Sequence, residues 1–272
     1  MRTVLVRLGL VCVGIIVISL MLSSISDLRA NAPRLQILAK IDPATCDGMW
    51  LFDDGGGAIA IDSSEKGNDG TLKNGPKWVD GKLGKALEFD GAKQQSMTTL
   101  PSTLMDPYPY TFAVWVKLDE YNPDGNTGAV VMGNYSGDGK GSIFYVSSTG
   151  LLSIRPHPGV DLKGKTKIPT GEWTHIATTL EGSNLKVYVN GEEDGSGTSV
   201  GYAGGLSKTF TIAKASWYDG SFFSGIIDEA GLFNKALTKD EIRSIMNTGL
   251  LGKAAVFSTG KLTTTWATIK TH

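Results

Sequence analysis

The chain has 272 residues, of which 35 are glycine and 10 are proline, and its formal net charge is −1 at neutral pH. A near-neutral chain without a run of basic residues lacks the positive face that nucleic acid requires, so we exclude nucleic-acid binding. The length fits one large all-β domain with appendages, and the glycine content predicts many turns.

Residues 1–32 differ in composition from the rest and predict an export segment. Arg2 and Arg7 precede an uncharged apolar run over residues 8–22. The residues Ala30-Asn31-Ala32 then have the small-x-small form of a signal-peptidase site. We therefore expect a secreted or extracytoplasmic protein.

The same segment leaves cleavage open. Its fifteen apolar residues are short for a membrane-spanning helix of about 20 residues, but residues 4–22 make a span feasible when Arg7 is tolerated. We expect either a cleaved signal peptide or an uncleaved membrane anchor. Any contact with a membrane is expected only through this segment, and residues 33–47 are expected to form a spacer.

The chain has two cysteines, Cys12 inside the apolar run and Cys46 after it. A cleaved chain would keep Cys46 as its single cysteine. We predict that Cys46 is a small buried hydrophobic residue near the first strand and not a catalytic thiol.

Residues 48–250 show the pattern of an all-β domain. Short apolar or alternating runs are separated by Gly, Asn, Asp and Pro, which is typical of an antiparallel sandwich. Tight-turn signals such as Asn190-Gly191 predict hairpins. The predicted strands are Met49–Phe52, Ala86–Phe89, Ser96–Leu100, Tyr110–Leu118, Ala129–Met132, Ile143–Val146, Leu151–Arg155, Thr174–Leu180, Leu185–Val189, Phe210–Ala213 and Phe222–Phe233.

One short helix is predicted near the end of this domain. Thr238 and Glu241 have the spacing of a capping box, and Gly249 supplies a left-handed stop. The apolar stripe between them consists of Ile242, Ile245 and Met246. Residues 251–272 are predicted to form a C-terminal tail.

Seven segments together resemble the laminin G-like, concanavalin A-like jelly rolls of bacterial exported proteins. They follow one another in the order that the family shows, between about Gly48 and Gly249. This resemblance implies an all-β fold with two antiparallel sheets stacked as a jelly-roll sandwich, and it leaves the ligand open. The segments are Trp50–Gly57, Asp62–Leu72, Gly84–Gly91, Thr111–Lys117, Gly171–Ala177, Leu185–Gly191 and Gly225–Leu237.

We predict that the domain is not an enzyme. Glycoside hydrolases of related fold place two carboxyl groups at a defined spacing on one strand, and no such spacing occurs here. Asp228 and Glu229 are adjacent and should point to opposite faces of a regular strand. The acidic residues 192–194 are expected in a solvated turn, His157 in a rigid loop between two prolines, and His175 packed within a strand.

Asp62, Asn68 and Asp228 are candidate ligands for a structural Ca²⁺ ion. The turn after the first strand is rich in oxygen donors, and the resemblance implies that the first and last strands are neighbours, which would bring Asp228 close to it. A buried carboxylate requires a partner. Backbone N–H groups of the turn, or a Lys or Arg, are the alternatives to calcium.

Aromatic and polar residues in predicted loops are the candidate ligand-binding residues. Trp217, Tyr218 and Asp219 form the most suggestive group, with Tyr135 and Asn134 in a second loop. Loop aromatics such as Tyr121 can instead fold back as lids over the sandwich end. The aromatic residues of predicted strands are expected in the core; these are Trp50, Phe89, Phe112, Trp115 and Trp173.

Two functions fit these observations. The first is a non-catalytic module that recognises carbohydrate at the cell surface. The second is an adhesion or structural module whose partner is a cell-surface protein. A role as the subunit of an enzyme whose catalytic domain lies on another chain stays open. Glycan binding that is lost on Trp217→Ala would favour the first.

Overall fold

The computed structural model describes residues 41–99, 109–122, 127–135, 140–199, 209–215 and 220–252. The chain divides into two units, Met1–Leu38 and Ala39–His272, and all described residues belong to the second. The predicted export segment and the C-terminal tail from residue 253 onward lie outside the described residues. Within the described ranges, no helix is long and apolar enough to cross a membrane.

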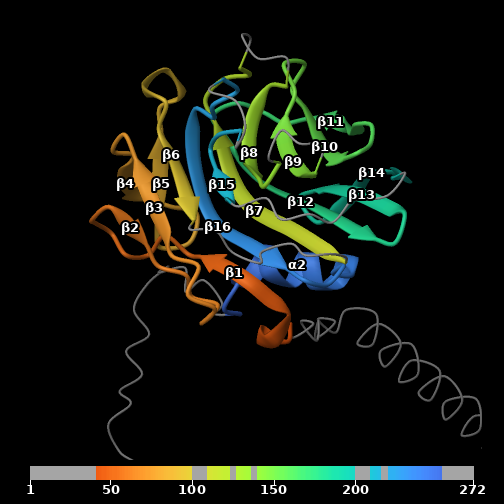
Figure 1. The fold of residues 1–272 in the computed structure, drawn as a ribbon, viewed down its shortest axis with the longest axis horizontal. Coiled ribbons are helices and arrows are strands. Elements are labelled where there is room, and N and C mark those ends of the chain that lie inside the picture. Colours follow the sequence, from red (N-terminus) through yellow and green to blue (C-terminus); the bar gives the residue numbers. More distant parts are fainter. Residues whose placement is uncertain are drawn as a thin grey trace, which may run out of the picture. The chain divides into compact units, whose positions relative to one another are not determined.

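Two eight-stranded sheets form the domain, and every pairing between their strands is antiparallel (Figure 1). The first sheet has the order β14-β13-β12-β7-β16-β5-β4, and β1 also pairs with β16. Its strands are β1 (Cys46–Trp50), β4 (Lys77–Asp80), β5 (Lys85–Phe89), β7 (Tyr110–Leu118), β12 (Trp173–Glu181), β13 (Asn184–Val189), β14 (Glu192–Thr198) and β16 (Gly225–Phe233).

The second sheet has the order β11-β10-β9-β8-β15-β6-β3-β2. Its strands are β2 (Ile59–Ala60), β3 (Gly70–Lys73), β6 (Ser96–Thr99), β8 (Ala129–Gly133), β9 (Gly141–Val146), β10 (Leu151–His157), β11 (Leu162–Lys167) and β15 (Thr211–Ile212). Two short 3₁₀ turns, η1 (Pro43–Thr45) and η2 (Gly91–Lys93), precede β1 and β6. The predicted jelly-roll sandwich is confirmed.

The core lies between the two sheets because alternate residues of each strand point inward. In β7, Phe112, Val114 and Val116 belong to this core, and Phe112 packs edge-on against Phe210 with ring centroids 5.9 Å apart. Trp50 stacks on the same Phe210 ring at 5.5 Å. The core positions predicted for Trp50, Phe89 and Phe112 are confirmed.

Trp115 does not belong to this core, contrary to the prediction. It occupies the opposite parity of β7 from Phe112 and Val114, and therefore points to the outer face of the first sheet. Trp173 is only half-buried at the start of β12. The position of Trp115 in a strand pattern thus predicted that it is buried, but it did not predict which face of the sheet the ring lies on.

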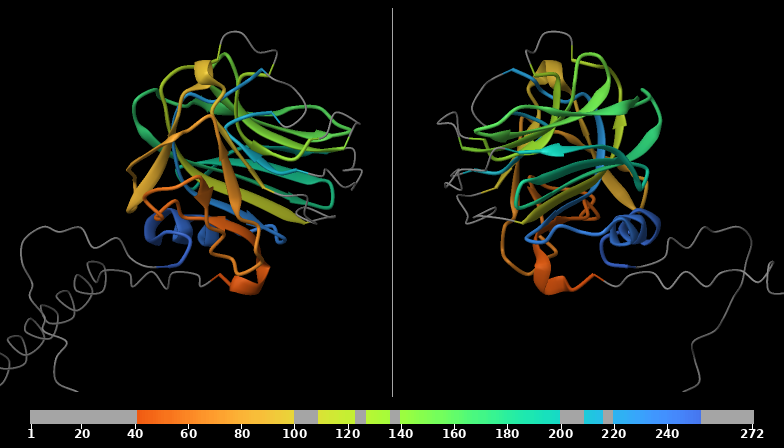
Figure 2. Two further views of the ribbon diagram at one scale, coloured as in Figure 1. Left: turned by 60° about the vertical axis from the view of Figure 1, so that its left-hand side comes forward. Right: turned by 90° about the vertical axis from the view of Figure 1, so that its right-hand side faces the viewer.

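Helix α2 (Lys239–Thr248) covers part of the outer face of the first sheet (Figures 1 and 2). Ile242 and Ile245 pack in a second apolar cluster with residues of β1, β7, β12 and β13. Cys46 belongs to this cluster and is fully buried, and burial raises its thiol pKa to about 12. Cys46 is therefore an inert apolar residue at the start of β1, as predicted, although β1 begins inside the stretch expected as a spacer.

The predicted capping box opens α2. The Thr238 hydroxyl accepts a hydrogen bond from the Glu241 N–H, and the Glu241 carboxylate accepts one from the Thr238 N–H at 2.8 Å. Thr238→Ala should lower the free energy of unfolding by about 1 kcal/mol, because one helix N–H loses its acceptor. Urea denaturation measures this cost. Thr238→Ser is the control, and an unchanged midpoint for Thr238→Ala would contradict it.

Five strands were not predicted from the sequence: β2, β3, β4, β11 and β14. Residues 192–194, expected in a turn, begin β14, because the tight turn at Asn190 and Gly191 ends directly before Glu192. The Asp194 carboxylate accepts hydrogen bonds from the backbone N–H groups of Lys165 and Thr166 in β11. This contact joins the edge strand of one sheet to the edge strand of the other.

Candidate functional site

Polar and aromatic side chains gather on the outer face of the second sheet. Tyr145 of β9 lies opposite Ser153 of β10, and Ile143 lies opposite Arg155. Residues directly opposite on antiparallel strands share a face, so these four project away from the core. We call the residues gathered here the outer-face cluster; it consists of Tyr135, Tyr145, Arg155, His157 and Asp161.

Arg155 and Asp161 form the charged centre of this cluster. The Arg155 Nε and Nη2 atoms donate to the two carboxylate oxygens of Asp161, the second at 2.8 Å. Both side chains are about a quarter or less exposed, at 27% and 19%. A bidentate pair of this kind fixes the plane of the guanidinium group.

The surroundings shift the pKa values of these groups. Burial alone raises the pKa of Asp161, but hydrogen bonds from Arg155 and Tyr145 outweigh it and hold the pKa below its usual range. Burial, followed by the charge of Asp161, raises the pKa of Tyr145. Asp161 is therefore ionised and Tyr145 is neutral at physiological pH, so the buried Tyr145 hydroxyl donates to Asp161 and helps to hold it in place.

Tyr135 and His157 form the aromatic part of the cluster. Their rings stack with centroids 3.7 Å apart and planes 20° from parallel. Both residues are half-buried. Burial, and then the positive charge of Arg155, lower the pKa of His157, so its imidazole is neutral at pH 7. Its Nε2 atom has no hydrogen-bond partner within the described parts of the chain.

The cluster combines an aromatic plane with fixed polar groups, the chemistry that recognises a sugar. A pyranose or furanose ring packs its C–H groups on an aromatic face, while its hydroxyls bond to side chains held in place. Asp161 is the only carboxyl group of the cluster and is bound to Arg155. Retaining or inverting hydrolysis requires two carboxyl groups facing the bond to be cleaved.

The predicted ligand-binding residues divide into three kinds. Tyr135 lies in the outer-face cluster. Asn134 is buried at 2% exposure, and its Oδ1 atom accepts a hydrogen bond from the Ser142 N–H, so it supports the connection between β8 and β9. Trp217, Tyr218 and Asp219 lie outside the described residues. Ala215, two positions before Trp217, packs with Tyr145, and Tyr135 packs against the same apolar group.

Tyr121, another loop aromatic, takes the alternative position considered for it. Its hydroxyl donates to the Ile168 carbonyl at 2.6 Å, and its ring packs against the sandwich core. It therefore packs over the sandwich end.

Two of the predicted calcium ligands, Asp62 and Asn68, lie together in the turn between β2 and β3. The Asp62 carboxylate accepts hydrogen bonds from the N–H groups of Met49, Ser64 and Asn68 at 2.9–3.0 Å, and from the Ser64 hydroxyl at 2.8 Å. Asp228 has a different partner, the Leu83 N–H. In the described part of the chain, no three His, Cys, Asp or Glu side chains are grouped to share a metal ion.

These contacts give Asp62 a role that needs no ion. Asp62→Ala should lower the free energy of unfolding by about 2 kcal/mol in chelator as well as in calcium, because the turn's donors lose their acceptor. Urea denaturation with each additive measures it, with Glu172→Ala at an exposed position as the control. A loss that appears only with calcium would assign Asp62 to a metal. Calcium bound by Asp62, Asn68 and Asp228 stays a prediction, and calorimetry of chelator-treated protein tests it.

Asp228 and Glu229 do not behave as neighbours on a regular strand. Glu229 has a φ of 50°, and the pairing of β16 with β7 shifts register between Asp228 and Gly231. This is a β-bulge, which turns both carboxyl groups toward the outer face of the first sheet. Asp228 accepts from the Leu83 N–H at 2.9 Å, and Glu229 accepts from the Leu250 N–H at 2.6 Å. The expectation of opposite faces was wrong because the bulge breaks the alternation.

The two bulge carboxyls are buried, with exposures of 0% and 7%. Burial raises the pKa of Asp228 to about 8, and the charge of Glu229 adds to the shift. Burial also raises the pKa of Glu229 to about 7. Such values can mark catalytic acids, but a substrate cannot reach groups that the chain covers. We assign both residues to holding the turn at Leu83 and the segment after α2.

Asp228 begins a row of buried polar side chains. It lies opposite Trp115, which lies opposite His175, and the Trp115 and His175 rings are 5.3 Å apart at 71°. Lys82 caps the Trp115 ring at 4.6 Å. Burial lowers the pKa of His175 to about 3, so this histidine is neutral and packed, as predicted.

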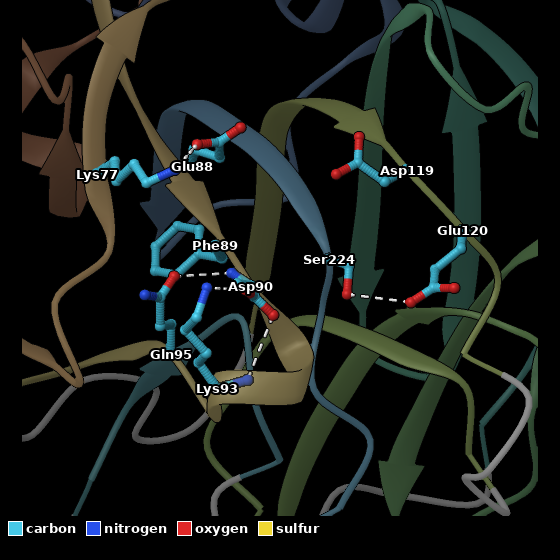
Figure 3. A pocket seen from close by; sticks show the side chains of 9 residues that line it. All are labelled: Lys77, Glu88, Phe89, Asp90, Lys93, Gln95, Asp119, Glu120 and Ser224. Carbon is cyan, nitrogen blue, oxygen red and sulfur yellow. Dashed lines mark hydrogen bonds and ion pairs between the residues drawn. The ribbon is translucent and has the colours of Figure 1, made fainter.

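A separate pocket of about 290 Å³ opens at the rim of the first sheet (Figure 3). Two of its carboxylates are paired with lysines, Glu88 with Lys77 at 3.3 Å and Asp90 with Lys93 at 2.5 Å. Side chains of β4, β5 and η2 lie on one side of it, with those of Ser224 and Glu120 on the other (Figure 3). Its one aromatic residue, Phe89, is buried in the core, so the pocket offers no aromatic face to a ligand.

Four members of the outer-face cluster were not predicted: Tyr145, Arg155, His157 and Asp161. The signal for two of them, Arg155 and His157, is their alternation with Ser153 along β10. It was overlooked because the strand was expected to end at Arg155, before Pro156. The structure continues β10 to His157, which is therefore a strand residue and not part of a loop.

Comparison with known proteins identifies the family to which the fold belongs. A family model for concanavalin A-like lectins and glucanases matches residues 90–243, more than half of the chain. No curated protein sequence matches. Among solved structures, domain 4 of AbnA, a GH43 extracellular arabinanase from Geobacillus stearothermophilus, in complex with arabinotriose, is 25% identical with a TM-score of 0.59. The match covers 74% of this chain and 98% of that domain.

Two more distant structures share the fold alone. The binding domain of botulinum neurotoxin DC in complex with SialylT is 11% identical with a TM-score of 0.58, over 75% of this chain and 52% of that one. A mutant of Trypanosoma rangeli sialidase displaying trans-sialidase activity is 14% identical with a TM-score of 0.60. That match covers 87% of this chain and 40% of the sialidase.

Proposed function

The chain belongs to the concanavalin A-like lectin/glucanase superfamily, and we propose that it is an exported, non-catalytic module that binds carbohydrate through the outer-face cluster. The observation that carries this proposal is the Tyr135–His157 stack beside the fixed Arg155–Asp161 pair. Because Arg155 is held by Asp161, its geometry is set before a ligand arrives, and less conformational entropy is lost on binding.

The arabinanase domain supports the same function. It spans nearly the same length as this β domain and was solved in complex with arabinotriose. Arabino-oligosaccharides are therefore the first ligands to test. Export rests on the sequence of residues 1–32. The non-catalytic role rests on the outer-face cluster having a single carboxylate, Asp161, which is paired with Arg155.

A glycan screen run with and without calcium tests the proposal. The full chain should bind one class of oligosaccharide without releasing reducing ends. Arabinan fragments are the first candidates. If the chain binds no glycan in the screen but captures a defined surface protein, the adhesion function replaces the proposal. Release of reducing ends that Asp161→Asn abolishes would make the protein an enzyme.

A further inference from the structure

The β10–β11 hairpin carries an unusual concentration of positive charge. Residues 151–167 contain four cations against the single carboxylate of Asp161, so the hairpin has a formal charge of +3 in a chain whose net charge is −1. The cations are Arg155, Lys163, Lys165 and Lys167. A local excess of one sign raises the concentration of oppositely charged ligands near that surface.

Two of these cations belong to the same surface as the outer-face cluster. Lys163 lies directly opposite Ser153, so it shares the outward face of β10 with Arg155. Its charge also contributes to lowering the pKa of Asp161, which places it near that carboxylate. Lys163 is exposed and forms no ion pair in the described ranges.

Asp161 does not neutralise the whole Arg155 group. It accepts from the Nε and Nη2 atoms of the guanidinium and not from Nη1, and the Tyr145 side chain is the second neighbour of the group. The guanidinium also lies 5.8 Å from the centre of the Tyr145 ring. An acceptor reaching Nη1 would thus meet a planar, oriented donor with a second cation, Lys163, on the neighbouring strand.

We infer that the outer-face cluster binds an anionic glycan, one that carries carboxylate or sulfate groups, with Arg155 and Lys163 contacting the charge and Tyr135 the sugar ring. This inference rests on the proposed function. A lipid surface would also be attracted to these cations, but it would not require the aromatic stack that lies beside them. A glycan uses both features.

The test compares oligogalacturonate with arabino-oligosaccharide of equal length by calorimetry at low and high salt. Oligogalacturonate should bind more tightly at 50 mM salt, and its advantage should shrink at about 500 mM, where the Debye length is shorter than at low salt. Lys163→Gln should weaken oligogalacturonate binding about two- to fivefold and leave arabino-oligosaccharide binding unchanged. Lys163→Glu should weaken it further.

Lys117→Gln is the matched control, because Lys117 lies on the outer face of the other sheet. Thermal denaturation checks that each variant is folded. Equal, salt-independent affinity for both glycans would overturn the inference and leave the proposed function intact. Binding of neither, with binding of another neutral glycan in the screen, would also overturn the inference alone, whereas no binding to any glycan of the screen would overturn both. Binding to phosphatidylglycerol vesicles that Tyr135→Ala leaves unchanged would overturn the inference in favour of a membrane surface.

Discussion

Asp228→Ala should lower the free energy of unfolding by about 2 kcal/mol at pH 5, because the Leu83 N–H loses the carboxyl group that accepts its hydrogen bond. Asp228→Asn should cost little at this pH. The amide oxygen can accept the same hydrogen bond, and the wild-type carboxyl is protonated and uncharged. Urea denaturation of the two variants measures the difference. Equal stability of the alanine variant and wild type would contradict the role assigned to Asp228.

The pH dependence of the same variants gives a second readout. Burial raises the pKa of Asp228 to about 8 in the folded protein, well above its unfolded value near 4. The folded state therefore binds the proton more tightly, and this contribution to stability is present at low pH and lost as pH rises from about 4 to about 8.

Asp228→Asn removes this pH dependence, because the amide resembles the protonated carboxyl group and does not titrate. It should leave stability at pH 5 nearly unchanged but should exceed wild type at pH 8.5 by at least about 1.4 kcal/mol, the equivalent of one pKa unit. Denaturation curves across this range measure the effect, with Asp80→Asn at an exposed position as the control. A constant difference between Asp228→Asn and wild type would contradict the raised pKa.

Tyr135→Ala should lower affinity for the best-binding oligosaccharide about tenfold or more, because it removes the aromatic plane of the outer-face cluster. Tyr135→Phe should retain most of the affinity, since the ring remains. Calorimetry measures both. The variants should melt near wild type because Tyr135 is only half-buried.

Tyr121→Phe is the control for this series. Tyr121 is also a loop aromatic, but its hydroxyl is bound to the Ile168 carbonyl and its ring faces the core. Glycan binding should survive this change. If Tyr121→Phe weakens binding and Tyr135→Ala does not, the glycan lies at the sandwich end and not on the outer face of the second sheet.

Local patterns predicted the parts of the fold that depend on neighbours in sequence. β7 was predicted with its observed bounds, Tyr110–Leu118, because a long, mainly apolar run without a turn residue predicts one uninterrupted strand. The capping box at Thr238 specified the start of α2 for the same reason. The edge strands β2 and β14 were not predicted. β2 has only two residues, too few to show an alternation, and β14 contains only Gly and polar residues.

The outer-face cluster could not be predicted as a whole, because it forms through contacts between strands that a local sequence pattern does not show. β10 continues through Pro156 because β11 pairs only with its first half, up to Ile154, so at Pro156 the strand is a local edge where proline is tolerated. Similarly, the bulge at Glu229 reverses the face expected for one of two adjacent acids. The partnership of Arg155 with Asp161 requires the β10–β11 turn to fold back, which composition does not reveal.

Amide chemical-shift mapping during titration with oligosaccharide tests the binding site most directly. The account predicts the largest changes at Tyr135 and between Arg155 and Lys163, on the outer face of the second sheet. Changes confined to the rim pocket at Glu88 and Ser224, or the absence of any change with ligands that the protein binds, would contradict it.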